Sequence, residues 1–79
     1  MFLALVMVLD AFFATRVLAQ TDEIRSVQAA LRRIGIYSGQ VDGFLGPGTE
    51  RAIEEYQLRE KRPATGQPDP WLDASLGIS

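Results

Sequence analysis

Apolar residues recur between residues 24 and 34 with the spacing of one face of a helix. They lie three or four residues apart, so they form a single stripe along a helix of 3.6 residues per turn. The stripe consists of Ile24, Val27, Ala30, Leu31 and Ile34. We expect Thr21 or Asp22 to cap this helix and Gly35 to end it. The polar residues predicted to cover its outer face are Arg25, Gln28, Arg32 and Arg33.

A glycine-rich stretch separates this helix from the next apolar pattern. Residues 36–46 contain glycines at positions 39, 43 and 46 together with several apolar side chains. Glycine adopts backbone conformations that a Cβ atom forbids, so we expect a structured loop that packs back on the core. The residues predicted to shape this loop are Gly35, Gly39, Asp42, Gly43, Gly46 and Pro47.

Two further helices are predicted after the loop. Pro47 suits the first position of a helix, and Glu55 and Arg59 are spaced to pair on its outer face. The inner face of this second helix is expected to consist of Thr49, Ala52, Ile53 and Tyr56. Asp69 followed by Pro70 predicts the start of a short third helix. The chain is therefore expected to be all-α, a compact three-helix bundle with a long loop between the first two helices.

Residues 1–19 are far more apolar than the rest, and we interpret them as a secretory signal peptide. The exceptions are Asp10, Thr15 and Arg16. Small residues end the segment at Ala19, which predicts cleavage there and a domain over residues 20–79. No basic residue precedes the apolar run, so an uncleaved membrane anchor stays open as the alternative. In either case the domain is expected outside the cytoplasm, in the periplasm or secreted.

The composition argues against several functional classes. The chain has eight Lys and Arg, ten Asp and Glu, and a formal net charge of −2, which does not suit nucleic-acid binding. It contains no cysteine and no histidine. Disulfide scaffolds, thiol nucleophiles, histidine triads and ordinary zinc sites therefore have no candidate residues. We expect no metal and no cofactor.

Catalysis by carboxylates alone is also poorly supported. Asp42, Glu50, Glu54 and Glu55 are the available acids near the loop, but they are predicted to lie on a solvated surface that cannot raise the pKa of one of them. The segment from Ser38 to Thr49 faintly resembles a calcium loop but lacks the bidentate glutamate at its last position. The chain is therefore not expected to be an enzyme.

Recognition by a shaped surface is the chemistry that remains. Tyr37 and Trp71 can stack on a sugar or cover a peptide, although each can equally be a packing residue. The start of the second helix offers backbone N–H groups at Gly48 and Thr49 beside Arg51, which can hold a carboxylate or simply be hydrated. The candidate ligand-binding residues are Tyr37, Ser38, Gly48, Thr49, Arg51 and Trp71.

Three motifs in succession resemble a known family. They are Leu-x-x-x-Gly at residues 31–35, Asp-Gly-x-x-Gly at residues 42–46 and Ala-Ile-x-x-Tyr-Gln at residues 52–57. In this order and spacing the chain resembles the peptidoglycan-binding-like domain over residues 24–77. That family is a three-helix module often attached to cell-wall hydrolases. Tyr56 stands where the family more usually has phenylalanine.

The resemblance implies a non-catalytic module that binds peptidoglycan, through its glycan or its stem peptide. It also implies that the module can hold a partner, such as a cell-wall hydrolase or another envelope protein, on the cell wall. A second interpretation keeps the fold but uses its surface for protein–protein docking in the cell envelope.

Overall fold

The computed structural model describes residues 21–78, so the predicted signal segment 1–19 lies outside the described residues. The described part contains a first helix over residues 21–33, α2 at Pro47–Arg59 and α3 at Pro70–Ser75. Within residues 21–78 there is no strand. The all-α prediction is thus confirmed for this part of the chain.

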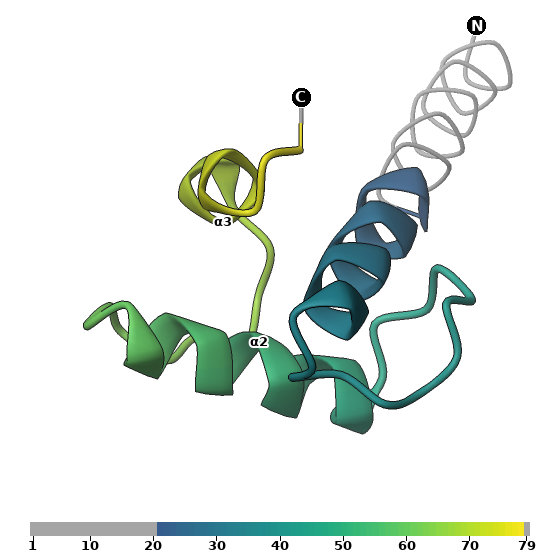
Figure 1. Cartoon of the computed structure of the whole chain (residues 1–79), viewed down its shortest axis with the longest axis horizontal. Coiled ribbons are helices and arrows are strands. Elements are labelled where there is room, and N and C mark those ends of the chain that lie inside the picture. Colours follow the sequence, from purple (N-terminus) through teal and green to yellow (C-terminus); the bar gives the residue numbers. More distant parts are fainter. Residues whose placement is uncertain (1–20, 79) are drawn as a thin grey trace, which may run out of the picture.

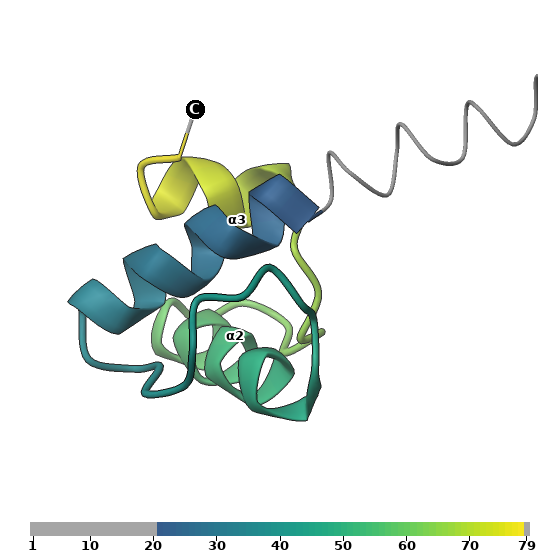
Figure 2. The same cartoon turned by 90° about the vertical axis from the view of Figure 1, so that its right-hand side faces the viewer.

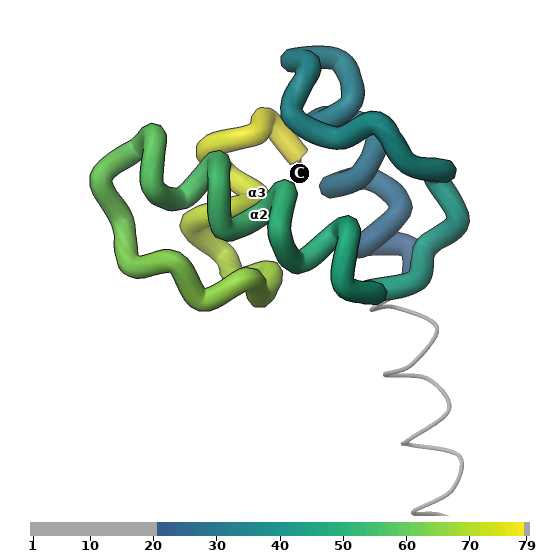
Figure 3. Tube along the Cα trace, turned by 90° about the horizontal axis from the view of Figure 1, so that it is seen from below, coloured from purple at the N-terminus to yellow at the C-terminus, as the bar shows by residue number. Residues whose placement is uncertain are grey.

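The helices form two layers. α2 makes one layer, and the first helix and α3 lie side by side over the same face of α2 (Figures 1 and 2). Figure 3 shows residues 60–69 looping back from the end of α2 to the start of α3. The shared core consists of Val27, Leu31, Ala52, Ile53, Tyr56 and Leu72. All three helices contribute to it, and each fully buried aliphatic side chain is worth about 1.5–3 kcal/mol relative to an exposed one.

Both later helices begin as predicted. Pro47 is the first residue of α2 after Gly46, whose position as N-cap brings no side-chain hydrogen bond. Asp69 is the N-cap of α3, and its carboxylate accepts a 2.7 Å hydrogen bond from the backbone N–H of Leu72. On the outer face of α2, Arg59 pairs with Glu55 at 3.1 Å.

Three predictions for the first helix are wrong. Ile34 is 51% exposed, because the helix ends at residue 33 and Ile34 already belongs to the turn that follows. Gln28 is fully buried instead of facing water. It lies four residues after Ile24 and three before Leu31, so the helical period itself places it on the inner face. Thr21 and Asp22 are both helical, so neither serves as the N-cap.

Candidate functional site

An open groove runs between the start of the long connection and the first two turns of α2. We call it the Tyr37–Arg51 groove. Its volume is about 330 Å³, and it is lined by Ile36, Tyr37, Ser38, Gly39, Gly48, Arg51, Ala52 and Glu55. Four of the six candidate ligand-binding residues therefore line one hollow, although Tyr37 and Ser38 are far in sequence from Gly48 and Arg51.

Tyr37 forms the wall of this groove on the side of the connection. Its hydroxyl donates a 2.7 Å hydrogen bond to the backbone carbonyl of Gln40. The ring lies so close to Gly39 that a Cβ atom there would sit 2.5 Å from the phenolic oxygen. Residues 37–40 are thus wrapped around the aromatic ring. This arrangement presents a half-buried ring together with the exposed hydroxyl of Ser38.

The opposite wall is the start of α2. Because no side chain caps this helix, the backbone N–H of Gly48 has no capping acceptor and keeps the partial positive charge of a helix N-terminus. Arg51 lies one turn further along, is exposed and makes no ion pair with the described residues. Glu55, also on the groove, is engaged with Arg59. This end of the groove therefore favours an anionic group.

The other two candidate ligand-binding residues lie elsewhere. Thr49 is only 3% exposed, and its hydroxyl accepts a 2.9 Å hydrogen bond from the side-chain amide of Gln28, so that side chain does not reach the surface of the groove. Trp71 lies on α3, where its ring contacts Tyr56 at a centroid distance of 6.1 Å. The guanidinium of Arg62 covers the Trp71 ring at 4.5 Å, in a cation–π contact.

A buried glutamine holds the second half of the connection in place. The Gln28 Nε2 group donates to the carboxylate of Asp42 at 3.0 Å, to the carbonyl of Phe44 at 3.0 Å and to the hydroxyl of Thr49 at 2.9 Å. Its Oε1 atom accepts from the backbone N–H groups of Asp42 at 3.0 Å and Gly43 at 2.9 Å. We call these five contacts the Gln28 clamp. The clamp ties the first helix, the connection and the start of α2 together.

Position 43, within the Gln28 clamp, requires glycine. Its φ of +78° lies in the left-handed region, and a Cβ atom would come within 2.7 Å of the Thr21 methyl group and 3.0 Å of the Thr21 carbonyl oxygen. The backbone conformation and the close approach each favour glycine. The other residues predicted to shape the loop lie along the same connection: Gly35 with φ +82°, Gly39 against Tyr37, Asp42 in the Gln28 clamp, and Gly46 and Pro47 at the start of α2.

Asp42 is held as a carboxylate by the same contacts. The backbone N–H of Phe44 donates to its Oδ1 atom at 3.0 Å, as does the Gln28 amide. Hydrogen bonds to the charged form, first from Phe44 and then from Gln28, lower the pKa of Asp42 below its ordinary value of 3.8. Asp42 therefore stays ionised at neutral pH, and its carboxylate helps to hold the loop through these hydrogen bonds.

A second buried glutamine repeats this arrangement at the other end of α2. Gln57 is 1% exposed; its Nε2 group donates to the hydroxyl of Thr65 at 3.0 Å and to the carbonyl of Gln67 at 3.5 Å. Its Oε1 atom accepts from the backbone N–H of Gly66 at 3.0 Å. We call these contacts the Gln57 clamp. Gly66 resembles Gly43, since its φ is +70°.

Neither glutamine was singled out by sequence reasoning. Gln28 was predicted to face water. Gln57 was named only as the last residue of the Ala-Ile-x-x-Tyr-Gln motif, with no role predicted for it. The signal that could have found them is their position, because each falls on the apolar stripe of its helix and precedes a segment that contains glycine. A polar side chain on such a stripe needs buried partners, and loop backbone supplies them.

The described residues offer little else in the way of chemistry. Within residues 21–78 no group of three or more acidic side chains is arranged to hold a metal ion. In that same part of the chain, no helix has the length and apolar character required to cross a bilayer. The described residues form a small all-helical domain with an open groove at which four of the candidate residues meet.

Comparison with known proteins names the family of this domain. Residues 20–71 match the family model described as "Putative peptidoglycan binding domain", and the chain belongs to that family. A "Putative OxPP cycle protein OpcA" from Synechococcus elongatus is 40% identical over 53 residues, which cover 67% of this chain and 11% of that protein. Its namesake from Nostoc punctiforme is 41% identical over 44 residues, covering 56% of this chain and 10% of that protein. The match thus spans about a tenth of these relatives, and no solved structure matches the chain.

Proposed function

We propose that this domain binds bacterial peptidoglycan without catalysing a reaction, and that the Tyr37–Arg51 groove is its binding surface. The observation that carries the proposal is the family match over residues 20–71. The groove is chosen because it gathers Tyr37, Ser38, Gly48 and Arg51, and because its two walls differ in chemistry. One wall is aromatic and the other is cationic.

The cationic wall favours a carboxylate as the group that is bound. Peptidoglycan stem peptides carry free carboxylates, and its glycan strands present sugar faces. A carboxylate would accept hydrogen bonds from the exposed guanidinium of Arg51 and from the free backbone N–H of Gly48. The ring of Tyr37 would cover the adjoining apolar part of the ligand. We therefore propose the stem peptide as the part of peptidoglycan that occupies the groove.

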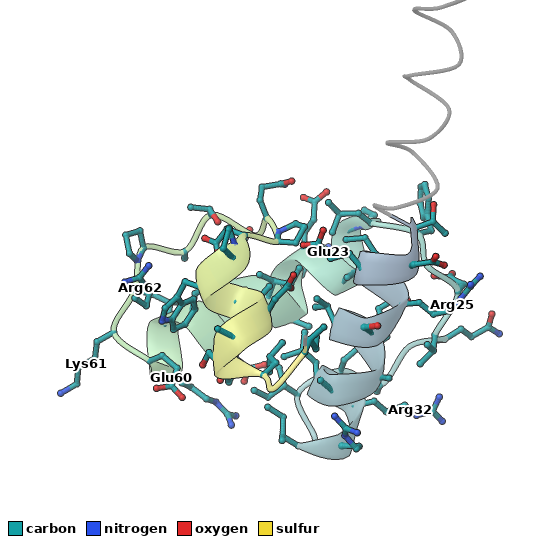
Figure 4. All side chains as sticks on the ribbon, turned by 90° about the horizontal axis from the view of Figure 1, so that it is seen from above. Glu23, Arg25, Arg32, Glu60, Lys61 and Arg62 are labelled. Atoms are coloured by element: carbon teal, nitrogen blue, oxygen red, sulfur yellow. The ribbon has the colours of Figure 1, made fainter. Side chains whose placement is uncertain are left out.

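Co-sedimentation with purified, insoluble peptidoglycan sacculi tests this function. Arg51→Gln removes the cation of the groove and keeps a long polar side chain, and Arg32→Gln is the matched control because Arg32 is also exposed and lies outside the groove (Figure 4). We expect about tenfold weaker binding for Arg51→Gln, the loss of one charge-assisted hydrogen bond, and unchanged binding for Arg32→Gln. Wild-type protein that stays in the supernatant would exclude the function. Equal effects of both substitutions would exclude the groove.

The N-terminal segment bears on where the domain works and on what it holds there. Residues 1–19 fit a cleavable export signal, so we propose that the domain works in the periplasm or outside the cell and holds a partner on the cell wall. A cell-wall hydrolase is the kind of partner proposed. Mass spectrometry of the exported protein would show whether its first residue is Gln20.

A second candidate function is protein–protein docking with the same fold. The observation that favours it is that two relatives carry the matched segment in about a tenth of their length and are named for the OxPP cycle. If docking is the function, pull-down from a periplasmic extract should return one stoichiometric partner after the peptidoglycan has been digested. Loss of all captured protein on digestion would favour peptidoglycan binding.

A further inference from the structure

Two acidic side chains, one on the first helix and one on α3, lie close enough to interact. Glu23 comes from the first helix and Asp73 from the first turn of α3. Figure 4 shows Glu23 on the side of the first helix that faces α3. Both side chains are half-buried. Two carboxylates in contact repel each other, so this contact is unfavourable when both are ionised.

One oxygen atom in this contact lacks a hydrogen-bond donor. The Oδ1 atom of Asp73 is buried and has no hydrogen-bond partner among residues 21–78. A buried acceptor without a donor is costly. The nearby carboxyl of Asp69 does not relieve this, because it is itself an acceptor for the backbone N–H of Leu72. A proton on Glu23 would supply the missing donor.

The charges around Glu23 all act in the same direction. Burial raises the pKa of Glu23 above its ordinary value of 4.5, and the proximity of Asp73, the hydrogen bond with Asp73 and the charge of Asp69 raise it further. On its own helix, the neighbouring cation Arg25 is paired with Asp22 at 3.8 Å. No charged group of α2 or of the described connections is among the causes acting on Glu23. The surroundings therefore favour the protonated form.

We propose that Glu23 and Asp73 form a proton-dependent link that fastens α3 to the first helix. A proton taken from solvent converts two repelling carboxylates into one carboxylic acid that donates a hydrogen bond to one carboxylate. The link forms when Glu23 takes up a proton and opens when Glu23 loses it. It does not depend on what the groove binds.

The sign of the effect follows from linkage. The folded state holds the Glu23 proton more tightly than the unfolded chain, so the link contributes fully below the unfolded pKa. Its contribution is lost as the pH rises through the raised folded pKa of Glu23. The direction is opposite to that of Asp42, whose lowered pKa contributes stability that is lost in acid.

Glu23→Gln tests the link, because the glutamine amide donates a hydrogen bond to Asp73 at every pH. The matched control is Glu60→Gln, which removes the same charge from an exposed position at the end of α2 (Figure 4). Unfolding of the full chain is followed through Trp71, its single tryptophan, which lies on α3. As the pH falls from 7 to 4.5, the ordinary value for glutamate, we expect the unfolding equilibrium constant of the wild type and of Glu60→Gln to fall about threefold. This change corresponds to one partly exposed hydrogen bond.

For Glu23→Gln we expect the same constant to be already low at pH 7 and to change little over the same pH range. Carboxyl NMR gives an independent measurement, in which Glu23 should titrate above the ordinary glutamate value of 4.5. Equal pH dependence in wild type and Glu23→Gln, or a Glu23 resonance that titrates at or below 4.5, would overturn the proposal.

Discussion

The Gln28 clamp and the Gln57 clamp use the same device at opposite ends of α2. In each, a fully buried glutamine accepts a hydrogen bond from the backbone N–H of a glycine with positive φ, Gly43 in one and Gly66 in the other. They differ in what they join. The Gln28 clamp links three segments through five contacts, whereas the Gln57 clamp has three contacts, one of them as long as 3.5 Å. The first clamp therefore joins more groups than the second.

This difference assigns the clamps separate tasks. The Gln28 clamp fixes residues 42–44 against Thr49 and thereby sets the connection relative to the start of α2. Those two segments carry the walls of the Tyr37–Arg51 groove. The Gln57 clamp holds residues 65–67, which lead into α3. We infer that the first clamp supports the groove and that the second supports the position of α3.

The largest expected effect comes from exchanging each glutamine for leucine. Gln28→Leu keeps the side-chain volume but leaves the buried N–H of Gly43 without an acceptor and removes the donor to the Thr49 hydroxyl. We therefore expect a loss of about 3 kcal/mol in the free energy of unfolding. Gln57→Leu should cost about 2 kcal/mol, because fewer groups are left unpaired. Urea unfolding measures both values. Where both proteins remain folded, only Gln28→Leu should weaken binding to sacculi; equal losses of binding would remove the distinction between the clamps.

Substituting Gly43 is expected to have a smaller effect on stability than Gln28→Leu. Gly43→Ala puts a Cβ atom at φ +78° and against Thr21, and we expect it to lower the free energy of unfolding by about 2 kcal/mol. The control is Gly48→Ala, where a Cβ atom meets nothing within 4 Å. In helix α2 this change should stabilise the protein by up to about 1 kcal/mol. Thermal unfolding separates the two, and a Gly43→Ala protein as stable as the wild type would contradict the role given to the Gln28 clamp.

The smallest expected effect is a pH dependence that the Gln28 clamp should show and the Gln57 clamp should not. Asp42 has a lowered pKa, so its contribution to stability is present above the unfolded value and is lost as the pH falls through its folded pKa. The Gln57 clamp contains no titratable side chain. Hydrogen exchange at pH 5 and pH 3 should therefore show Gly43 losing protection relative to Gly66. Asp42→Asn should remove that pH dependence, and its persistence in this variant would rule out Asp42 as the cause.

Apolar spacing and helix-start residues predicted most of the fold. Pro47 and Asp69-Pro70 marked the starts of α2 and α3 correctly, because these signals are local. The burial of Gln28 was missed because its partners lie 14 to 21 residues away, and no local pattern reports contacts across such a distance. Ile34 was placed wrongly because apolar spacing continued one residue beyond the end of the helix.

For the site, residue types indicated the chemistry but not the geometry. Tyr37 and Arg51 were chosen as an aromatic and a cation near glycines, and both line the groove. Trp71 was chosen as a second aromatic, and its ring lies apart from the groove, covered by Arg62. Thr49 was chosen for its backbone N–H, and its side chain is buried against Gln28. Which polar group faces solvent depends on the packing of the whole domain.

NMR of the isotope-labelled full chain during titration with soluble peptidoglycan fragments tests most directly whether the groove is the binding surface. The account predicts chemical-shift changes that saturate together at Tyr37, Ser38, Gly48 and Arg51, with little change at the indole N–H of Trp71. Changes confined to Trp71 and α3, or no change at any of the four groove residues, would contradict it.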